Sequence, residues 1–146
     1  MREIKEIIVH CTATPEGREV TIHDIDQWHR EAGYKGIGYH YVVYLDGSVH
    51  VGRDESYIGA HCVGYNADSI GVCYVGGMDK AMKNAKDTRT EEQKKSLIEL
   101  LQSLKAKYPE ATIYGHRNFS SKDCPSFDAK TEYSRIGTTM HKCNMI

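Results

Sequence analysis

Apolar residues gather in three short runs that predict strands. Residues 4–11 carry four β-branched side chains and end at a turn-prone segment, residues 12–17. Residues 69–75 form a second apolar run that is closed by two glycines, and residues 111–115 form a shorter third run. Short apolar runs bounded by turn signals are typical of strands, and the first two runs are long enough to be fully buried.

Two segments have the spacing of amphipathic helices. Residues 21–32 open with a capping box and are followed by Gly33, a typical helix stop. A longer helix is predicted to begin at Thr90, with Gln93 as its capping-box partner, and to end before Pro109. The apolar stripe of this longer helix consists of Leu97, Leu100, Leu101, Leu104 and Tyr108.

Between these helices, residues 38–45 and 48–52 predict a β-hairpin. They are joined by Asp46-Gly47, and Asp-Gly is a strong signal for a two-residue hairpin turn. Side chains of a strand alternate between its two faces. The alternation therefore predicts one face with Tyr39, Tyr41, Val43 and Leu45, and an opposite face with His40, Val42 and Tyr44.

The order of these elements favours an α/β fold. Strands and helices alternate along the chain, and a further short helix is predicted over residues 128–133. Because a hairpin requires an antiparallel pair, we expect a central mixed β-sheet flanked by helices. The predicted domain spans residues 1–136, and residues 137–146, which show no pattern, are expected to form a flexible tail.

The composition is that of a soluble globular protein and argues against several classes of partner. The chain has 146 residues, of which 40% are hydrophobic, and a formal net charge of -1, so it lacks the basic character of nucleic-acid-binding proteins. No apolar run approaches the ~20 residues of a membrane span. Residues 1–6 do not resemble a signal peptide. We therefore expect a monomer without nucleic-acid, membrane or protein partners, retained in the cytoplasm until another factor releases it.

The cysteines indicate free thiols rather than a disulfide framework. There are five, an odd number at irregular spacing, and no export signal accompanies them. Most are expected to be small buried residues. His141 and Cys143 form a pair in the predicted tail, where we do not expect a metal site. Among the five cysteines, Cys124 is the one that we expect to bind a metal, together with His116.

His10, His116 and Cys124 are the strongest candidates for metal ligands. Each histidine comes at the C-terminal end of a predicted strand, the edge at which ligand sites form in open α/β sheets. His10 and Cys11 must point to opposite faces, so His10 is the better partner for His116. Two imidazoles and one thiolate leave the fourth position of tetrahedral zinc open, as in catalytic sites. With eight histidines and five cysteines in the chain, spacing alone leaves open that the three residues are unrelated.

Two further side chains could act beside such a metal. Lys122, two residues before Cys124, could stabilise the negative charge of a tetrahedral intermediate. Tyr39 could donate a proton or position the attacking water. The alternatives are a solvated loop lysine and a tyrosine at the core or rim of a strand. The histidines expected to be structural or solvated are His23, His29, His40 and His50.

Several ordered motifs resemble one known family. Along the chain they are IVHCTAT (8–14), QWH (27–29), GYH (38–40), DG (46–47), GRDE (52–55), GYN (64–66), SIGVC (69–73) and KDCPSFD (122–128). Together they resemble the zinc-dependent N-acetylmuramoyl-L-alanine amidases over residues 4–134, in particular the small phage lysozymes that cleave an amide rather than a glycosidic bond. Peptidoglycan recognition proteins share the fold of this family.

The resemblance implies a fold, a reaction and seven site residues. The fold is a mixed sheet with zinc in a surface groove, and residues 1–136 become the catalytic domain. The reaction is hydrolysis of the amide between N-acetylmuramic acid and L-alanine in peptidoglycan, by an endolysin-like enzyme that lyses the cell wall. The residues are the zinc ligands His10, His116 and Cys124, the catalytic residues Tyr39 and Lys122, and the substrate-contact candidates His61 and Asn66.

Two other functions stay open at this point. A recognition module would bind peptidoglycan without cutting it, although non-catalytic relatives commonly lack the cysteine ligand that this chain has. A glycosidase would need two carboxyl groups roughly 5–10 Å apart, for example Asp54 or Glu55 with a partner. Because no added cell-wall-binding domain is apparent, affinity for the wall is expected to come from the catalytic groove alone.

Overall fold

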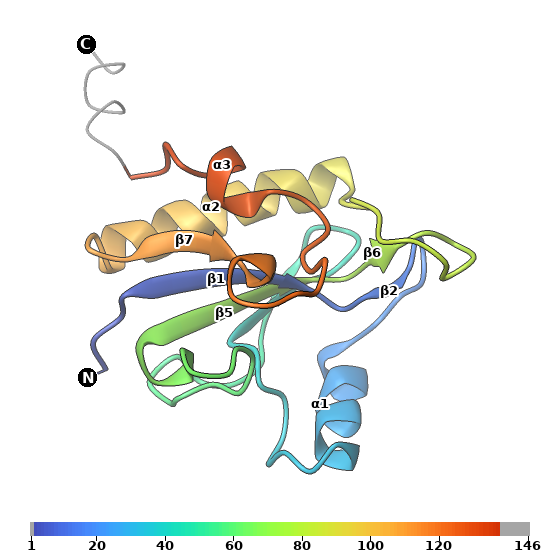
Figure 1. Ribbon diagram of the computed structural model, residues 1–146, viewed down its shortest axis with the longest axis horizontal. Helices are drawn as coiled ribbons and strands as arrows, with labels where there is room; N and C mark the ends of the chain where they lie inside the picture. The colour runs from blue at the N-terminus through green and yellow to red at the C-terminus, as the bar shows by residue number, and fades with distance from the viewer. Residues whose placement is uncertain (1, 138–146) are drawn as a thin grey trace.

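The computed structural model describes residues 2–137 and has a five-stranded sheet at its centre (Figure 1). The strand order is β4-β3-β5-β1-β7, with every neighbouring pair parallel except β3 and β4. The expected mixed sheet with flanking helices is confirmed. The strands are β1 (Glu6–Cys11), β3 (Tyr41–Val43), β4 (Val49–Val51), β5 (Ser69–Tyr74) and β7 (Thr112–Gly115). The predicted tail beyond residue 137, with its His141 and Cys143 pair, lies outside the described residues.

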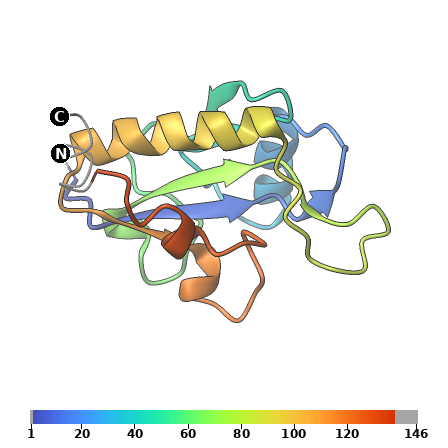
Figure 2. The same cartoon turned by 90° about the horizontal axis from the view of Figure 1, so that it is seen from above.

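β1 and β5 form the middle of the sheet and run in the same direction, as the blue and green arrows of Figure 2 show. Every residue of β5 is buried, and so is every residue of β1 after Glu6. Parallel strands covered on both faces have this all-apolar character. Both strands were predicted as buried runs, and the register between them pairs His10 with Cys73.

One face of the sheet is covered by α2 (Glu91–Lys107), which lies above the strands in Figure 1. The predicted capping box is present, since Thr90 and Gln93 exchange side-chain to backbone hydrogen bonds of 2.9 and 3.0 Å. The Gln93 amide also donates to two strand carbonyls, which ties the helix start to the sheet. The buried cluster on this face includes Leu97, Leu101, Leu104, Ile7, Val9, Ile70 and Val72, with Ala129 of the short helix α3 (Ala129–Glu132).

The opposite face of the sheet packs against α1 (Ile22–Glu31), which lies below the strands in Figure 1. Thr21 caps this helix and forms the predicted capping box with Asp24. Ile25 is the buried anchor of the helix. Its cluster includes Val20, Ile37, Val42, Cys73 and Val75. The strand residues here alternate with those under α2, so the two clusters lie on opposite faces.

The structure corrects the predicted faces of the hairpin. Tyr41 and Val43 pack in the α2 cluster as expected, but Tyr39 and Leu45 pack in the α1 cluster. The strict alternation fails because β3 is only three residues long, so that both Tyr39 and Leu45 lie outside it. Tyr39 is thereby placed on the same face of the sheet as His10.

Small elements complete the fold. β2 (Thr14–Pro15) and β6 (Gly77–Met78) form a separate two-stranded sheet, and Met78 also forms an isolated antiparallel bridge with Ala85. Two 3-10 turns, η1 (Asn66–Asp68) and η2 (His116–Asn118), lie next to β5 and β7. Within residues 2–137, no helix has the length and apolar character needed to cross a membrane.

The core under α2 yields a stability test. Leu101 is fully buried, whereas Ile98 on the same helix is 41% exposed. Leu101→Ala should lower the free energy of unfolding by about 2–5 kcal/mol, because it removes buried methyl groups and leaves a cavity. Urea denaturation of both alanine variants measures this, and Ile98→Ala should have a much smaller effect. Equal losses for the two variants would contradict the packing of α2.

Candidate active site and metal centre

His10 sits at the centre of the candidate site because of its place in β1. Its neighbours Val9 and Cys11 point into the α2 cluster, so His10 points to the other face, where it is 1% exposed. Three rings surround the imidazole, with centroid distances of 4.6 Å to His116, 4.8 Å to His61 and 5.1 Å to Tyr39.

His116 reaches His10 from the neighbouring strand. It directly follows β7, and the parallel register of β1 with β7 pairs Val9 with Gly115. The two histidines therefore leave the same edge of the sheet side by side. Asn118 accepts a 2.9 Å hydrogen bond from the Gly115 amide and so fixes the turn η2 on which His116 lies. The predicted meeting of His10 and His116 at one sheet edge is confirmed.

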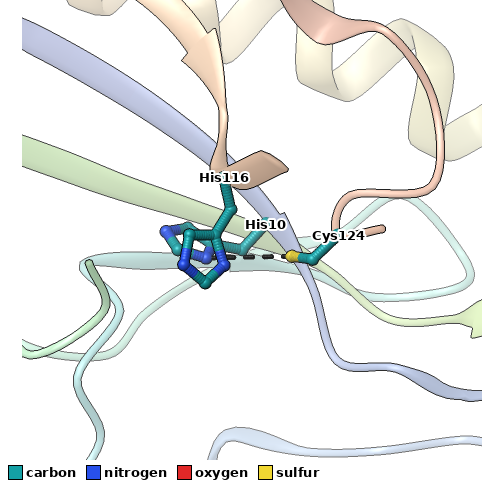
Figure 3. Close-up of side chains that lie close together, drawn as sticks. All are labelled: His10, His116 and Cys124. Atoms are coloured by element: carbon teal, nitrogen blue, oxygen red, sulfur yellow. Dashed lines mark hydrogen bonds between the residues drawn. The ribbon is translucent and has the colours of Figure 1, made fainter. Parts of the chain in front are cut away.

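Cys124 comes from the loop after η2, and backbone contacts hold this loop against the end of β1. The amide of Cys11 donates to the Cys124 sulfur over 3.2 Å, and the Arg117 amide donates to the Cys124 carbonyl over 2.7 Å. The Tyr74 hydroxyl donates to the next carbonyl, that of Pro125, over 2.7 Å. These anchors place the sulfur beside His10, as Figure 3 shows.

The three side chains present a donor set suited to zinc. One ligand atom from each of His10, His116 and Cys124 lies within 4.8 Å of the others, and no second cluster of this kind occurs among the described residues. His10 Nδ1 is 3.9 Å from Cys124 Sγ. With zinc bonds of about 2.0–2.3 Å, tetrahedral ligands lie roughly 3.3–3.6 Å apart, so His10 and Cys124 need only a small contraction. Nitrogen and sulfur ligands in this number fit a three-residue zinc site with one open position.

The burial of the site favours neutral imidazoles, which are the form that binds metal. Burial, with smaller contributions from the neighbouring histidines, lowers the pKa of His10. Burial and the nearby Lys122 ammonium lower the pKa of His116. Contact with the Cys11 thiol and burial raise the pKa of Cys124, so its ionisation depends on a bound cation.

A groove of about 480 Å³ adjoins the candidate metal centre and has His116 in its wall. It brings together the predicted residues Tyr39, Lys122, His61, Asn66 and His116. Burial raises the pKa of Tyr39, so its phenol stays protonated at neutral pH and is a hydrogen-bond donor. The exposed side chain of Lys122 is close enough to His116 to shift its pKa, which sets a cation beside the candidate metal centre.

His61 and Asn66 line the groove, but most of their polar atoms bond within the protein. His61 is bonded through Nδ1 to His10 Nε2 over 2.8 Å and through Nε2 to Ser69 Oγ over 3.2 Å. Asn66 Oδ1 accepts two 2.9 Å hydrogen bonds, from the amides of His61 and Cys62. Contact with substrate therefore stays a prediction for both residues.

Sequence reasoning missed His29 as a groove residue. It lies on the last turn of α1, and its ring stands between those of Tyr34 and Tyr39, at 5.9 and 5.3 Å. Its Nδ1 accepts a 2.9 Å hydrogen bond from the Gly38 amide, which leaves Nε2 for the groove. Its position at the end of the amphipathic helix and next to Trp28 was the available signal. Phe119, the residue that directly follows η2, also lines the groove and was not identified from the sequence.

The carboxylates considered for a glycosidase lie elsewhere. Asp54 and Glu55 line a different pocket, and none of the described residues around the 480 Å³ groove is an aspartate or glutamate. Glu55 instead accepts hydrogen bonds from two tyrosine hydroxyls and forms a 2.7 Å ion pair with Lys107. A pair of carboxyl groups across a sugar is therefore absent from this groove.

Comparison with known proteins places this arrangement in a family. The sequence profile of the N-acetylmuramoyl-L-alanine amidases matches residues 1–127. An endolysin of Klebsiella phage KP32 is 43% identical over 142 residues, which are 96% of this chain and 93% of that protein. An endolysin of Escherichia phage T7 is 46% identical over 124 residues, 85% of this chain and 82% of that protein.

A solved structure supports the same assignment. The N-acetylmuramoyl-L-alanine amidase LysC from Clostridium intestinale superposes with a TM-score of 0.77 at 29% identity, covering 92% of this chain and 84% of that one. The fold, the profile match and the phage relatives agree with one another. The chain belongs to the N-acetylmuramoyl-L-alanine amidase family.

Proposed function

We propose that this protein is a zinc-dependent hydrolase of the amide bond between N-acetylmuramic acid and L-alanine in peptidoglycan. The observation that carries the proposal is the convergence of His10, His116 and Cys124 within 4.8 Å, beside a groove that is lined by His116, Tyr39 and Lys122. Membership of the amidase family supplies the reaction class. The carboxylate-free groove favours amide over glycoside hydrolysis.

We assign zinc to His10 Nδ1, one ring nitrogen of His116 and Cys124 Sγ. Bound there, zinc would supply a Lewis acid for the scissile carbonyl and a water molecule whose pKa is lowered to about 7. The amide of Cys11, which donates to the sulfur, stabilises the thiolate that zinc requires. The lowered pKa values of the two histidines keep both rings neutral for coordination.

The protein's own groups then act on the substrate. The Lys122 ammonium lies at the groove surface beside His116 and offsets negative charge on the oxygen of the tetrahedral intermediate. The protonated Tyr39 phenol, whose ring lies 5.1 Å from that of His10, donates a hydrogen bond to the attacking water or the substrate. Asn66 keeps its Nδ2 for a substrate carbonyl, since its Oδ1 is occupied by two amides. His61 offers substrate only its ring edge.

The wider role that we propose is lysis of the bacterial cell wall after release from the cytoplasm. The relatives from phages KP32 and T7 are endolysins. We further propose that the protein acts as a monomer, with peptidoglycan as its partner. A recognition module that binds without cutting is the alternative, and the intact three-ligand set, which includes Cys124, argues against it.

Removal of a ligand should abolish zinc binding and activity together. Cys124→Ala and His116→Ala leave only two ligands, so metal content should fall from about one zinc per chain to near zero. His23→Ala, at an exposed position on α1, is the matched control and should retain both properties. Elemental analysis of the purified variants and release of stem peptides from peptidoglycan measure the two effects. A Cys124→Ala variant that keeps its zinc would contradict the ligand assignment.

Loss of the lysine should separate catalysis from metal binding. Lys122→Ala should bind zinc normally yet lose about 10²–10³ in kcat, because a donor to the developing oxyanion is removed. Lys83→Ala, an exposed lysine in a distant loop, serves as control. Steady-state rates on a soluble muramyl peptide, compared with zinc content, test this. Wild-type turnover by Lys122→Ala would remove the lysine from the mechanism.

Proton release on zinc binding should report the neutral histidines. At pH 6.0, two imidazoles of ordinary pKa and one thiol would release about 2.5 protons when zinc binds. Because the pKa values of His10 and His116 are lowered, we expect fewer than two, mostly from Cys124. Calorimetric titration of the zinc-free protein in buffers of different ionisation enthalpy gives the number. A value near 2.5 would mean that both rings are protonated before zinc binds.

A further inference from the structure

A second buried histidine lies directly behind the candidate zinc ligand. His61 is 9% exposed, and its ring stands at 88° to that of His10, with 2.8 Å between His61 Nδ1 and His10 Nε2. On its other side, His61 Nε2 lies 3.2 Å from Ser69 Oγ. The three side chains form one hydrogen-bonded row that leads from the metal centre into the sheet.

The direction of the hydrogen bonds in this row follows from the role of His10. The His10 nitrogen that faces Cys124 in Figure 3 is Nδ1, so this atom must be unprotonated to bind a metal. The proton of a neutral His10 is then on Nε2, which donates to His61 Nδ1. His61 must in turn carry its proton on Nε2, which donates to Ser69 Oγ. The reverse direction would place a proton on the ligating nitrogen of His10.

The surrounding backbone is built to hold the His61 ring in this place. A Cβ atom at Gly71 would lie 2.6 Å from the ring, and one at Gly59 would lie 2.7 Å from it. Only glycine therefore leaves room at these two positions. The Asn66 side chain accepts hydrogen bonds from the amides of His61 and Cys62 and fixes the loop from which the ring projects. The position of the ring thus depends on Gly59 in a loop, Gly71 in β5 and Asn66 in η1.

We propose that His61 is a positioning residue that fixes the tautomer and ring orientation of His10, so that Nδ1 is presented to zinc. The inference rests on the proposed function and goes beyond it, because it gives His61 a role through His10 and not through contact with substrate. Partners that orient a ligating histidine are typically worth 10–100-fold in metal affinity. Ser69 completes the row, because its Oγ accepts the hydrogen bond that His61 Nε2 donates.

The first test is the zinc affinity of His61 variants. His61→Leu removes the acceptor and should weaken zinc binding about 10–100-fold. His61→Asn retains an acceptor close to the position of Nδ1 and should restore most of the affinity. Competition with a chromophoric chelator measures both dissociation constants, and thermal unfolding of the zinc-free variants verifies that they are folded. Equal affinity of the leucine variant and the unchanged chain would overturn the proposal.

Two other variants separate positioning from general loss of structure. His50→Leu removes a half-buried histidine that stacks on Tyr44 and bonds Ser48 but has no hydrogen bond or ring contact with His10 or His61. It should leave zinc affinity near that of the unchanged chain. Ser69→Ala, a milder change, should weaken zinc binding in the same direction as His61→Leu. An effect of His50→Leu as large as that of His61→Leu would overturn the proposal.

A spectroscopic readout is independent of affinity and activity. Nitrogen-15 NMR of the histidine rings in the zinc-loaded protein should show His10 protonated at Nε2, with a hydrogen-bonded proton that exchanges slowly. The signal should persist in His61→Asn and exchange rapidly in His61→Leu. Protonation of His10 at Nδ1 would overturn the row as drawn. If the unchanged chain bound no zinc, the proposed function would fail first, so the two failures are distinguishable.

Discussion

The parallel pairing of β1 with β7 is the constraint on which the site depends. It pairs Val9 with Gly115, so His10 and His116 emerge from adjacent strands at one edge of the sheet. Burial of Val9 and Cys11 under α2 turns His10 to the opposite face. The amide of Cys11 then holds the Cys124 sulfur. The core that stabilises the sheet therefore also determines the geometry of the proposed metal ligands.

The candidate metal centre is buried and uncharged, whereas the adjoining groove carries a positive charge. Burial lowers the pKa values of His10 and His116, and it lowers the pKa of His61 to about 3, so three adjacent rings are uncharged at neutral pH. Around the groove, Lys122 supplies positive charge and no described residue supplies a carboxylate. A cation bound at the candidate metal centre would be the dominant local charge, and it would determine the chemistry of the groove.

Much of the fold and the metal centre could be predicted from sequence, because both depend on local patterns. Apolar runs located β1 and β5, capping boxes located both long helices, and strand ends located the two histidines of the proposed zinc site. The side of the sheet taken by Tyr39 could not be predicted, since alternation holds only inside the short strand β3. The contact between His61 and His10 was also missed. It joins residues 51 positions apart, and it is possible only because Gly71 has no side chain to collide with the His61 ring.

The most direct test of the account is mass spectrometry of purified peptidoglycan after digestion with the protein, with and without a zinc chelator. The account predicts free stem peptides with a new alanine amine, lost on chelation and restored by added zinc. Tight binding with every glycan–peptide amide intact would contradict it and indicate a recognition module. New reducing sugar ends with intact amides would contradict it as well, and would mean that the bond cut is glycosidic.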